Sequence, residues 1–367
     1  MADRWILQFC HCHYGPFLDV ARQYAALFHG SPYKVLTVYL TGTPSPEAEA
    51  GSASDEVIFL NYSSRAVGGL KLSAIRAVGK IAASRDVALV IAHRFKPIYI
   101  ACLATRLPVI GVHHGFGDYK RLMRRWFANL FQKRLRLFGV SDAVRDDMRT
   151  CLSAWPQAYI QTLYNRIDVA RVRAEQFPRE EARAVLGLPE NAYIIGNVGR
   201  LHPDKDQATL IRGFALAQQA LPQGSLLAIM GEGELEGSLK ILAETLGVGK
   251  HVRFLGQIPQ ARRYFRAFDV FALTSNHEPF GMVILEAMAA DLPVITTNCG
   301  GAKEIVSGHG LLFPLGDAQA LAILLKQASI NPNSGKGRVE AFSDAAIRRD
   351  FWQKLSRLDL LPMGGAI

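Results

Sequence analysis

Residues 193–206 read Tyr-Ile-Ile-Gly-Asn-Val-Gly-Arg-Leu-His-Pro-Asp-Lys-Asp, a short apolar run that ends in a glycine turn bearing two cations. Similar runs alternate with longer helix-like segments along the chain, a pattern typical of parallel sheets covered by helices. The sequence therefore predicts an α/β fold. A strand that ends at Val198 would place Arg200 and Lys205 at the carboxyl edge of a sheet, where such sheets bind ligands.

The same alternation occurs in both halves of the chain, so each half is predicted to be a doubly wound, Rossmann-like domain. In the first half, strands are expected at residues 5–9, 33–40, 57–60, 87–92, 109–112, 137–140 and 159–163. In the second half, they are expected at residues 193–198, 225–230, 252–254, 270–273 and 293–296.

A charged segment with a proline, residues 166–182, separates the two halves, and residues 331–338 form a turn-rich break. Beyond this break, residues 344–360 carry apolar side chains at helical spacing. We therefore expect a first domain over residues 1–167, a second over 168–340, and a segment 341–367 whose helix packs back on the first domain.

Positive charge is concentrated in the first half. The chain has 42 Lys and Arg against 32 Asp and Glu, and residues 1–160 account for +9 of the net charge of +10. No apolar run reaches the roughly 18 residues of a membrane span, and the N-terminus lacks the pattern of a signal peptide. Five cysteines at irregular spacing do not resemble a disulfide framework. We therefore expect a cytoplasmic protein.

Two carboxylates, Glu278 and Glu286, lie eight residues apart in the second half. Pro279 biases Glu278 away from helix, and Gly281 allows the backbone to approach a ligand closely. Glu286 falls on an apolar helix, where a charge needs hydrogen-bond partners or a ligand. Together with the helix N-terminus, the two carboxylates suit an anionic, hydroxyl-rich molecule such as a nucleotide sugar.

The cations Arg200 and Lys205, five residues apart on one loop, suit a diphosphate. Taken alone, the loop is better explained by a solvated basic turn. Its place in the same domain as the two glutamates favours the ligand. Asp204 and Asp206 also form an Asp-x-Asp pattern, but the neighbouring cations already supply counter-charge, so we expect no metal and no other cofactor.

Two glycine-containing turns give weaker signals. Gly231 and Gly233 follow the strand at 225–230, where the backbone could approach a nucleotide, and Ile258 lies in a turn that could present amides to a base. An ordinary strand-to-helix connection explains these residues equally well.

In the first half, His113 and His114 follow the strand at 109–112, and structural and catalytic roles are equally consistent with that position. The run Cys10-His11-Cys12-His13 suggests zinc at first sight. Adjacent ligands cannot all reach one tetrahedral ion, and no second cluster completes a site. We therefore interpret this run as the loop after the first strand, with Gly15 at its turn.

Residues 119–137 carry much of the positive charge. Apolar residues recur at steps of three and four, and basic residues occupy most other positions; the apolar set is Met123, Trp126, Phe127, Leu130 and Phe131. This pattern suits a basic amphipathic helix on an anionic membrane surface. It suits equally a helix whose apolar side packs on the sheet and whose basic side faces solvent. No nucleic-acid-binding motif accompanies it.

The second half resembles the donor domain of the retaining family 4 glycosyltransferases of GT-B fold. The resemblance rests on residues 199–205, 231–233, 278–289 and 293–306, and the first half is similar more thinly, through residues 108–113, 140–144 and 165–168. The family usually has a glycine where Arg166 stands, and a glycine pair where residues 11–15 stand. Bacterial lipopolysaccharide-core and other envelope glycosyltransferases are the members that it most resembles.

The resemblance implies two Rossmann-like domains that face a central cleft, with the acceptor bound by the first and the donor by the second. It implies that Arg200 and Lys205 bind the diphosphate, Glu286 the ribose, and Glu278 the transferred sugar. The implied donor-binding residues are Gly199, Arg200, Lys205, Gly231, Gly233, Ile258, Glu278, Phe280, Gly281, Met282, Val283 and Glu286. The implied catalytic residues are His113, Arg200, Lys205 and Glu278, and the acceptor-side residues are His13, Gly15 and His114.

The expected function is a retaining, metal-independent transfer of a sugar, from a UDP-sugar by preference, to a glycolipid or envelope polysaccharide such as lipopolysaccharide core. The expected place of action is the inner face of the cytoplasmic membrane, on an anionic surface, without nucleic acid. Two alternatives remain open from the sequence. One is a sugar-nucleotide epimerase of the same fold, and the other is a non-enzymatic basic protein that binds nucleotides or membrane surfaces.

Overall fold

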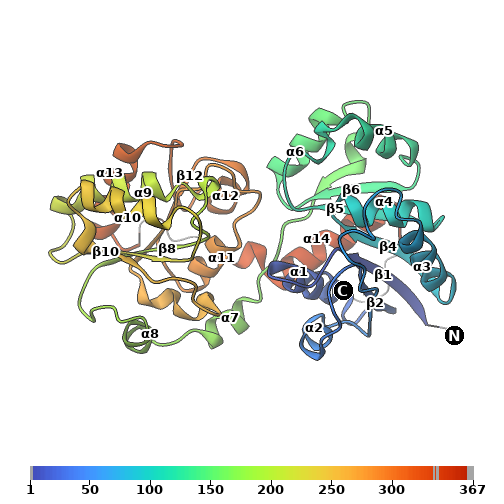
Figure 1. Cartoon of the computed structure of the whole chain (residues 1–367), viewed down its shortest axis with the longest axis horizontal. Helices are drawn as coiled ribbons and strands as arrows, with labels where there is room; N and C mark the ends of the chain where they lie inside the picture. Colours follow the sequence, from blue (N-terminus) through green and yellow to red (C-terminus); the bar gives the residue numbers. More distant parts are fainter. Residues whose placement is uncertain (1–2, 334, 336–338, 362–367) are drawn as a thin grey trace. The chain divides into compact units, whose positions relative to one another are not determined.

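The computed structural model describes residues 3–333, 335 and 339–361, and the chain divides into two compact units (Figure 1). Unit 1 comprises Met1–Arg166 and Asp344–Ile367, and unit 2 comprises Ile167–Ser343. Residues 334 and 336–338 of the turn-rich break, and 362–367 of the C-terminal segment, lie outside the described residues. Among the described residues, no helix combines the length and apolar character required to cross a bilayer.

Unit 1 contains a seven-stranded parallel sheet in the order β3-β2-β1-β4-β5-β6-β7. Its strands are β1 (Arg4–Cys10), β2 (Tyr33–Tyr39), β3 (Glu56–Phe59), β4 (Asp86–His93), β5 (Val109–His113), β6 (Leu135–Gly139) and β7 (Ile160–Thr162). Side chains from both faces of the central strands, such as Ile6, Leu7, Val90 and Ile91, are fully buried. This is why the strands are continuous apolar runs in the sequence.

Helices flank this sheet, and the C-terminal helix belongs to the same unit. They are α1 (Pro16–Ala25), α2 (Pro46–Gly51), α3 (Leu72–Ala83), α4 (Phe95–Ala104), α5 (Leu122–Leu130), α6 (Asp142–Cys151) and α14 (Asp344–Arg357). On α14, the Trp352 Nε1 donates to the Leu27 carbonyl at 3.0 Å, and Phe351 packs edge-on against Phe28. Arg166 ties this helix to α1, because it pairs with Asp344 and donates to the Gln23 carbonyl.

Unit 2 contains a six-stranded parallel sheet in the order β10-β9-β8-β11-β12-β13. Its strands are β8 (Ile194–Val198), β9 (Leu226–Met230), β10 (Val252–Phe254), β11 (Val270–Leu273), β12 (Val294–Thr297) and β13 (Leu311–Phe313). Its helices are α7 (Val169–Glu175), α8 (Arg179–Val185), α9 (Gln207–Ala217), α10 (Glu236–Thr245), α11 (Met282–Ala289), α12 (Gly300–Val306) and α13 (Ala318–Ile330). In Figure 1, α9, α10 and α13 lie on one side of this sheet and α7, α8 and α11 on the other. Both sheets are therefore doubly wound, as the sequence predicts.

Each strand expected from the sequence is present, with its ends displaced by at most two residues. The edge strand β13 is missing from the sequence prediction. It contains three residues, and Leu312 in its centre is 38% exposed. So short and half-exposed a strand gives neither an apolar run nor a clear alternation.

The prediction of one basic helix over residues 119–137 is wrong in extent. Helix α5 covers only Leu122–Leu130, and residues 135–137 belong to β6. Arg134 and Arg136 are used internally, because Arg134 donates to the Leu107 carbonyl at 3.0 Å and Arg136 covers the Tyr159 ring at 3.5 Å. These two cations therefore bind groups inside the unit, whereas the periodicity places them on a solvated helix face.

A buried arginine connects α8 to the sheet of unit 2. Arg183 is 1% exposed, and it donates to the carbonyls of Ala267 and Ala192 at 2.8 and 2.9 Å and pairs with Asp269 at 2.8 Å. Asp269 also accepts from the backbone of Ile194 at 2.7 Å, at the start of β8. These bonds fix the amino ends of β8 and β11.

We predict that Arg183→Met lowers the stability of unit 2 by about 3 kcal/mol, because it strands buried carbonyls and weakens the pairing of Asp269. This corresponds to a fall of roughly 6–12 °C in the midpoint of thermal unfolding. Arg179→Met is the matched control, since Arg179 pairs with the same carboxylate from the surface and its loss costs at most about 1 kcal/mol. Equal midpoints for the two variants would contradict the prediction.

Candidate functional site

The strand order of unit 2 reverses direction between β8 and β11. From β8 the chain proceeds outward to β9 and β10, and from β11 it proceeds the other way to β12 and β13. Because the strands are parallel, the loops that follow β8 and β11 leave the same edge and diverge to opposite faces of the sheet. Such a switch point is where open α/β sheets bind ligands.

An ion pair joins these two loops at the switch point. The Lys205 Nζ lies 2.7 Å from the Glu278 Oε2, and both side chains are largely buried, with 17% and 9% of their surfaces exposed. The Ser275 hydroxyl donates to the same oxygen at 3.2 Å, and the Thr274 hydroxyl donates to the Lys205 carbonyl at 2.9 Å. Two residues that the sequence assigned to diphosphate and sugar are therefore direct partners, and Ser275 is a third member that sequence reasoning missed.

Arg200 lies on the same loop but is mostly exposed, and its guanidinium pairs with Asp204 at 3.2 Å. The other Asp204 oxygen lies 2.6 Å from the His202 Nδ1. Asp206 instead caps α9, where its carboxylate accepts from the Thr209 hydroxyl at 2.7 Å. The two carboxylates of the Asp-x-Asp pattern thus have separate partners, and in the described part of the chain no three His, Cys, Asp or Glu side chains gather as a metal site.

The glycine turn after β9 packs directly on the Arg200 loop. Gly199 donates to the Met230 carbonyl and Leu201 donates to the Glu232 carbonyl, both at 2.9 Å. A Cβ on Gly231, whose φ is 147°, would lie 1.9 Å from the Gly199 oxygen, and one on Gly233 would lie 2.3 Å from the Leu201 oxygen. Glycine is therefore required here so that two loops at the carboxyl edge can touch through their backbones.

Helix α11 begins at the same edge. Gly281 precedes it with φ at 107°, a left-handed conformation that favours glycine. Phe280 is 4% exposed, and its ring packs edge-on against Phe342. The remaining predicted donor contacts are half-buried. They are Met282, Val283 and Glu286 in the first turns of α11, and Ile258 after β10.

In unit 1, His113 ends β5 and is fully buried. Its Nδ1 lies 2.8 Å from the Asp118 Oδ2, and its Nε2 lies 3.1 Å from the Tyr119 hydroxyl. Burial raises the pKa of Asp118, but hydrogen bonds and charges from His113 and Arg124 outweigh it and hold that pKa below its usual value. Both nitrogens of His113 therefore serve a network inside the unit.

The predicted acceptor-side residues lie after β1 and β5. The His13 Nε2 lies 3.0 Å from the Thr43 carbonyl, and Gly15 precedes α1 with φ at 56°. His114 lies 3.2 Å from His93, and burial, with the nearby positive charges of His113 and Arg94, lowers the pKa of His114 to about 3. His114 is therefore neutral at physiological pH.

The loop that suggested zinc shows a structural thiol. Cys10 lies at the end of β1 and is 2% exposed, and burial raises the pKa of its thiol to about 12. The Gln8 amide lies 3.6 Å from its sulfur. At physiological pH this sulfur is therefore protonated.

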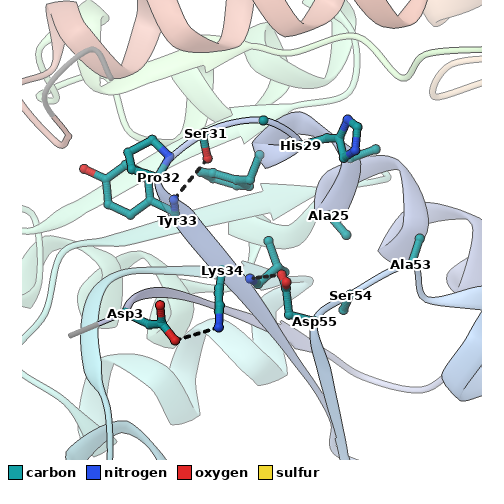
Figure 2. A pocket seen from close by; sticks show the side chains of 14 residues that line it. Asp3, Ala25, His29, Ser31, Pro32, Tyr33, Lys34, Ala53, Ser54 and Asp55 are labelled. Atoms are coloured by element: carbon teal, nitrogen blue, oxygen red, sulfur yellow. Dashed lines mark hydrogen bonds and ion pairs between the residues drawn. The ribbon is translucent and has the colours of Figure 1, made fainter. Parts of the chain in front are cut away.

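A hollow of about 540 Å³ lies at the opposite end of the unit 1 sheet, beside the start of β2 (Figure 2). Its charged groups are paired with one another or with backbone. Lys34 contacts Asp3 at 2.6 Å, and Asp55 accepts from the Val35 amide at 2.8 Å. This hollow lies at the amino ends of the strands, away from the edge that carries the candidate residues.

Comparison with known proteins relates the two halves to one group of enzymes. The family model "Glycosyl transferases group 1" matches residues 178–348, and the model "Glycosyltransferase Family 4" matches residues 17–171. The lipopolysaccharide core biosynthesis glycosyltransferase LpsE of Rhizobium meliloti is 37% identical over 147 residues, 40% of this chain and 42% of that protein. A D-inositol 3-phosphate glycosyltransferase of Saccharomonospora viridis is 32% identical over 211 residues, 54% of this chain and 48% of that protein.

The chain thus spans less than half the length of these curated relatives. Among solved structures, Anabaena Alr3699/HepE in complex with UDP-glucose matches with a TM-score of 0.76 at 22% identity, covering 97% of this chain and 100% of that one. At that identity the likeness shows the fold, which is the α/β fold that the two parallel sheets display.

We predict that Lys205→Ala lowers the midpoint of thermal unfolding, whereas Arg200→Ala leaves it within about 1–2 °C of the wild type. The reason is that Lys205→Ala leaves the buried Glu278 carboxylate without its cation, while Arg200 is exposed. Adding Glu278→Gln to Lys205→Ala should recover part of the loss, as a double-mutant cycle would measure. An unchanged midpoint for Lys205→Ala would show that the pair does not hold the two loops.

Proposed function

We propose that the chain is a family 4 glycosyltransferase of GT-B fold that transfers a sugar from a UDP-sugar to a glycolipid or envelope polysaccharide such as lipopolysaccharide core. The observation that carries this proposal is the Lys205–Glu278 pair, set at the switch point of unit 2 beside the Arg200 loop. The names of LpsE and of HepE with UDP-glucose support the acceptor and the donor, respectively.

In the proposed complex, the cations and the carboxylate of this site divide the donor between them. A lysine ammonium has three donors, so Lys205 keeps Glu278 as a partner while it binds a phosphate oxygen. The exposed Arg200 needs only to exchange the half-buried Asp204 for a second phosphate oxygen. Glu278 accepts from sugar hydroxyls and Glu286 from the ribose, and the Gly231 and Gly281 turns bring backbone close to the nucleotide.

We propose that the charges act on the leaving group. Breaking the anomeric bond transfers negative charge to the departing diphosphate, and Arg200 and Lys205 stabilise that charge more in the transition state than in the ground state. The acceptor attacks from the face that the diphosphate leaves, and a phosphate oxygen takes its proton, so the anomeric configuration is retained. No metal takes part in this proposal.

An apolar face of α5 supports association with the inner face of the cytoplasmic membrane. Met123 and Trp126 are 73% and 62% exposed, and Leu122 and Leu130 are equally prominent. Phe127, by contrast, packs on Tyr99 with ring centroids 4.9 Å apart and anchors the helix. Exposed Arg121 at the helix start adds positive charge beside these side chains. Trp and Leu flanked by cations suit an anionic bilayer surface.

The donor assignment predicts which nucleotide the chain binds and through which residues. UDP should bind more tightly than GDP or ADP in calorimetry with EDTA present, and UDP-glucose should stabilise the chain against heat. Arg200→Ala and Lys205→Ala should each weaken UDP binding by about tenfold or more, because each removes a charge-assisted hydrogen bond.

Lys240→Ala is the matched control for this measurement, since Lys240 pairs with Glu236 on the exposed face of α10. Undiminished UDP affinity in Lys205→Ala, or binding that requires added metal, would count against the proposed site.

The membrane assignment predicts binding to vesicles that contain phosphatidylglycerol but not to vesicles of phosphatidylcholine alone. Met123→Ser with Trp126→Ser should release the chain from the anionic vesicles in a flotation assay. Ile323→Ser is the control, because Ile323 is equally exposed, at 68%, but lies on α13 of unit 2. Wild-type chain that fails to float with anionic vesicles would end the membrane proposal.

A further inference from the structure

Unit 1 has its own switch point, and a cavity of about 320 Å³ opens there. Strands β1 and β4 are neighbours, and from them the order runs outward to β2 and β3 on one side and to β5, β6 and β7 on the other. The loops after β1, β4 and β5 line the cavity, together with the first turn of α4 and one residue of α5. The polar lining residues are His11, Arg94, Lys96, His114, Asp118 and Arg124.

The positive charge in this cavity is not balanced. Asp118 is the carboxylate of the lining, and its two oxygens are taken by His113 and Arg124. Within residues 3–333, 335 and 339–361, no Asp or Glu forms an ion pair with Arg94 or Lys96. The Arg94 guanidinium lies over the Phe17 ring, 4.6 Å from its centre, which fixes the group without neutralising it.

The imidazole of His11 responds to this charge. Burial lowers the pKa of His11 first, and the positive charges of Lys96 and Arg94 lower that pKa further. Its Nδ1 is a buried atom for which the described residues provide no hydrogen-bond partner. The cavity therefore holds two cations without a carboxylate partner beside the neutral ring of His11, and an anionic ligand would balance the charge of these cations.

The backbone between β4 and α4 adds to the positive electrostatic potential of the cavity. Arg94 has φ at 72°, a conformation that costs a non-glycine residue about 1–3 kcal/mol. It is held there by the 2.8 Å hydrogen bond from its amide to the Val112 carbonyl. Helix α4 is ten residues long, and among the described residues no side chain caps its N-terminus. Phe95 and Lys96 of its first turn line the cavity, so the positive end of the helix dipole lies there, and their two amides precede Pro97, which has no N–H.

From these observations we infer that the cavity binds a phosphoryl group, held by Arg94, Lys96 and the first turn of α4, with His11 at its side. A phosphomonoester dianion matches two cations and a helix N-terminus. A volume near the lower limit of small-molecule sites, about 300 Å³, leaves room for the phosphate and part of the group that bears it. The inference rests on the proposed function in one respect, namely that the phosphoryl group belongs to the sugar acceptor.

The test uses the full chain labelled with ¹⁵N in its histidine rings, at constant ionic strength. Glucose 6-phosphate and inorganic phosphate should shift the His11 and His114 signals saturably, and glucose should not. His251 and His309 of unit 2 should remain unshifted. Lys96→Gln should weaken the binding by about tenfold or more, whereas Lys80→Gln, an exposed lysine on α3, should leave it unchanged.

Shifts that rise linearly with phosphate, or that are equal in the Lys96→Gln and Lys80→Gln variants, would overturn the inference. A second arm uses vesicles of phosphatidylcholine with phosphatidic acid. If these vesicles, and not glucose 6-phosphate, perturb His11 in a Lys96-dependent manner, the phosphate is that of a lipid headgroup and the acceptor assignment is overturned.

Calorimetry with UDP on the same samples separates this inference from the proposed function. Loss of phosphate binding in a chain that still binds UDP would remove only the unit 1 site. Phosphate binding in a chain that fails to bind UDP would remove the donor assignment and keep the cavity.

Discussion

The ion pair between Lys205 and Glu278 is the contact on which the candidate site of unit 2 depends. It joins two loops that leave neighbouring parallel strands in opposite directions, and a partly buried pair of this kind is stable only while both partners are present. The glycine turn at Gly231 packs on the loop of Arg200 and Lys205, and α11 starts four residues after Glu278. Loss of either partner would therefore disturb the backbone that surrounds the predicted donor.

The two units repeat one physical solution at their switch points. In each, a strand order that reverses leaves polar loops at the carboxyl edge, and cations from these loops gather beside the amino end of a helix. They differ in how charge is balanced. Unit 2 pairs Lys205 with a carboxylate, whereas Arg94 and Lys96 of unit 1 stay unpaired among the described residues and depress the pKa of His11.

Most of the fold could be read from the sequence, because strands buried on both faces are continuous apolar runs, as Leu89 and Val90 show. Features that depend on distant partners could not. The short edge strand at Leu311–Phe313 has too few buried residues to give a pattern. The periodicity places Arg134 and Arg136 on a helix, but in the structure Arg134 bonds to the Leu107 carbonyl and Arg136 lies over the Tyr159 ring.

The candidate site was predictable to the same degree. Motifs locate Arg200, Lys205 and Glu278. They do not show that Lys205 and Glu278, which are 73 residues apart in the chain, bind each other. Arg94 and Lys96 give no motif, since only the neighbouring positions of β1 and β4 bring them to His11. A cation directly after a buried strand is the one signal that could have drawn attention to them.

Retaining transfer from a nucleotide sugar is the central claim, and it can be tested without knowing the acceptor. ¹H NMR of UDP-glucose incubated with the chain follows which anomer of glucose is released as water replaces the acceptor. The account predicts that α-glucose and UDP are released first and that β-glucose appears only later by mutarotation. Initial release of β-glucose would contradict the account. So would conversion of UDP-glucose to another UDP-sugar without release of glucose.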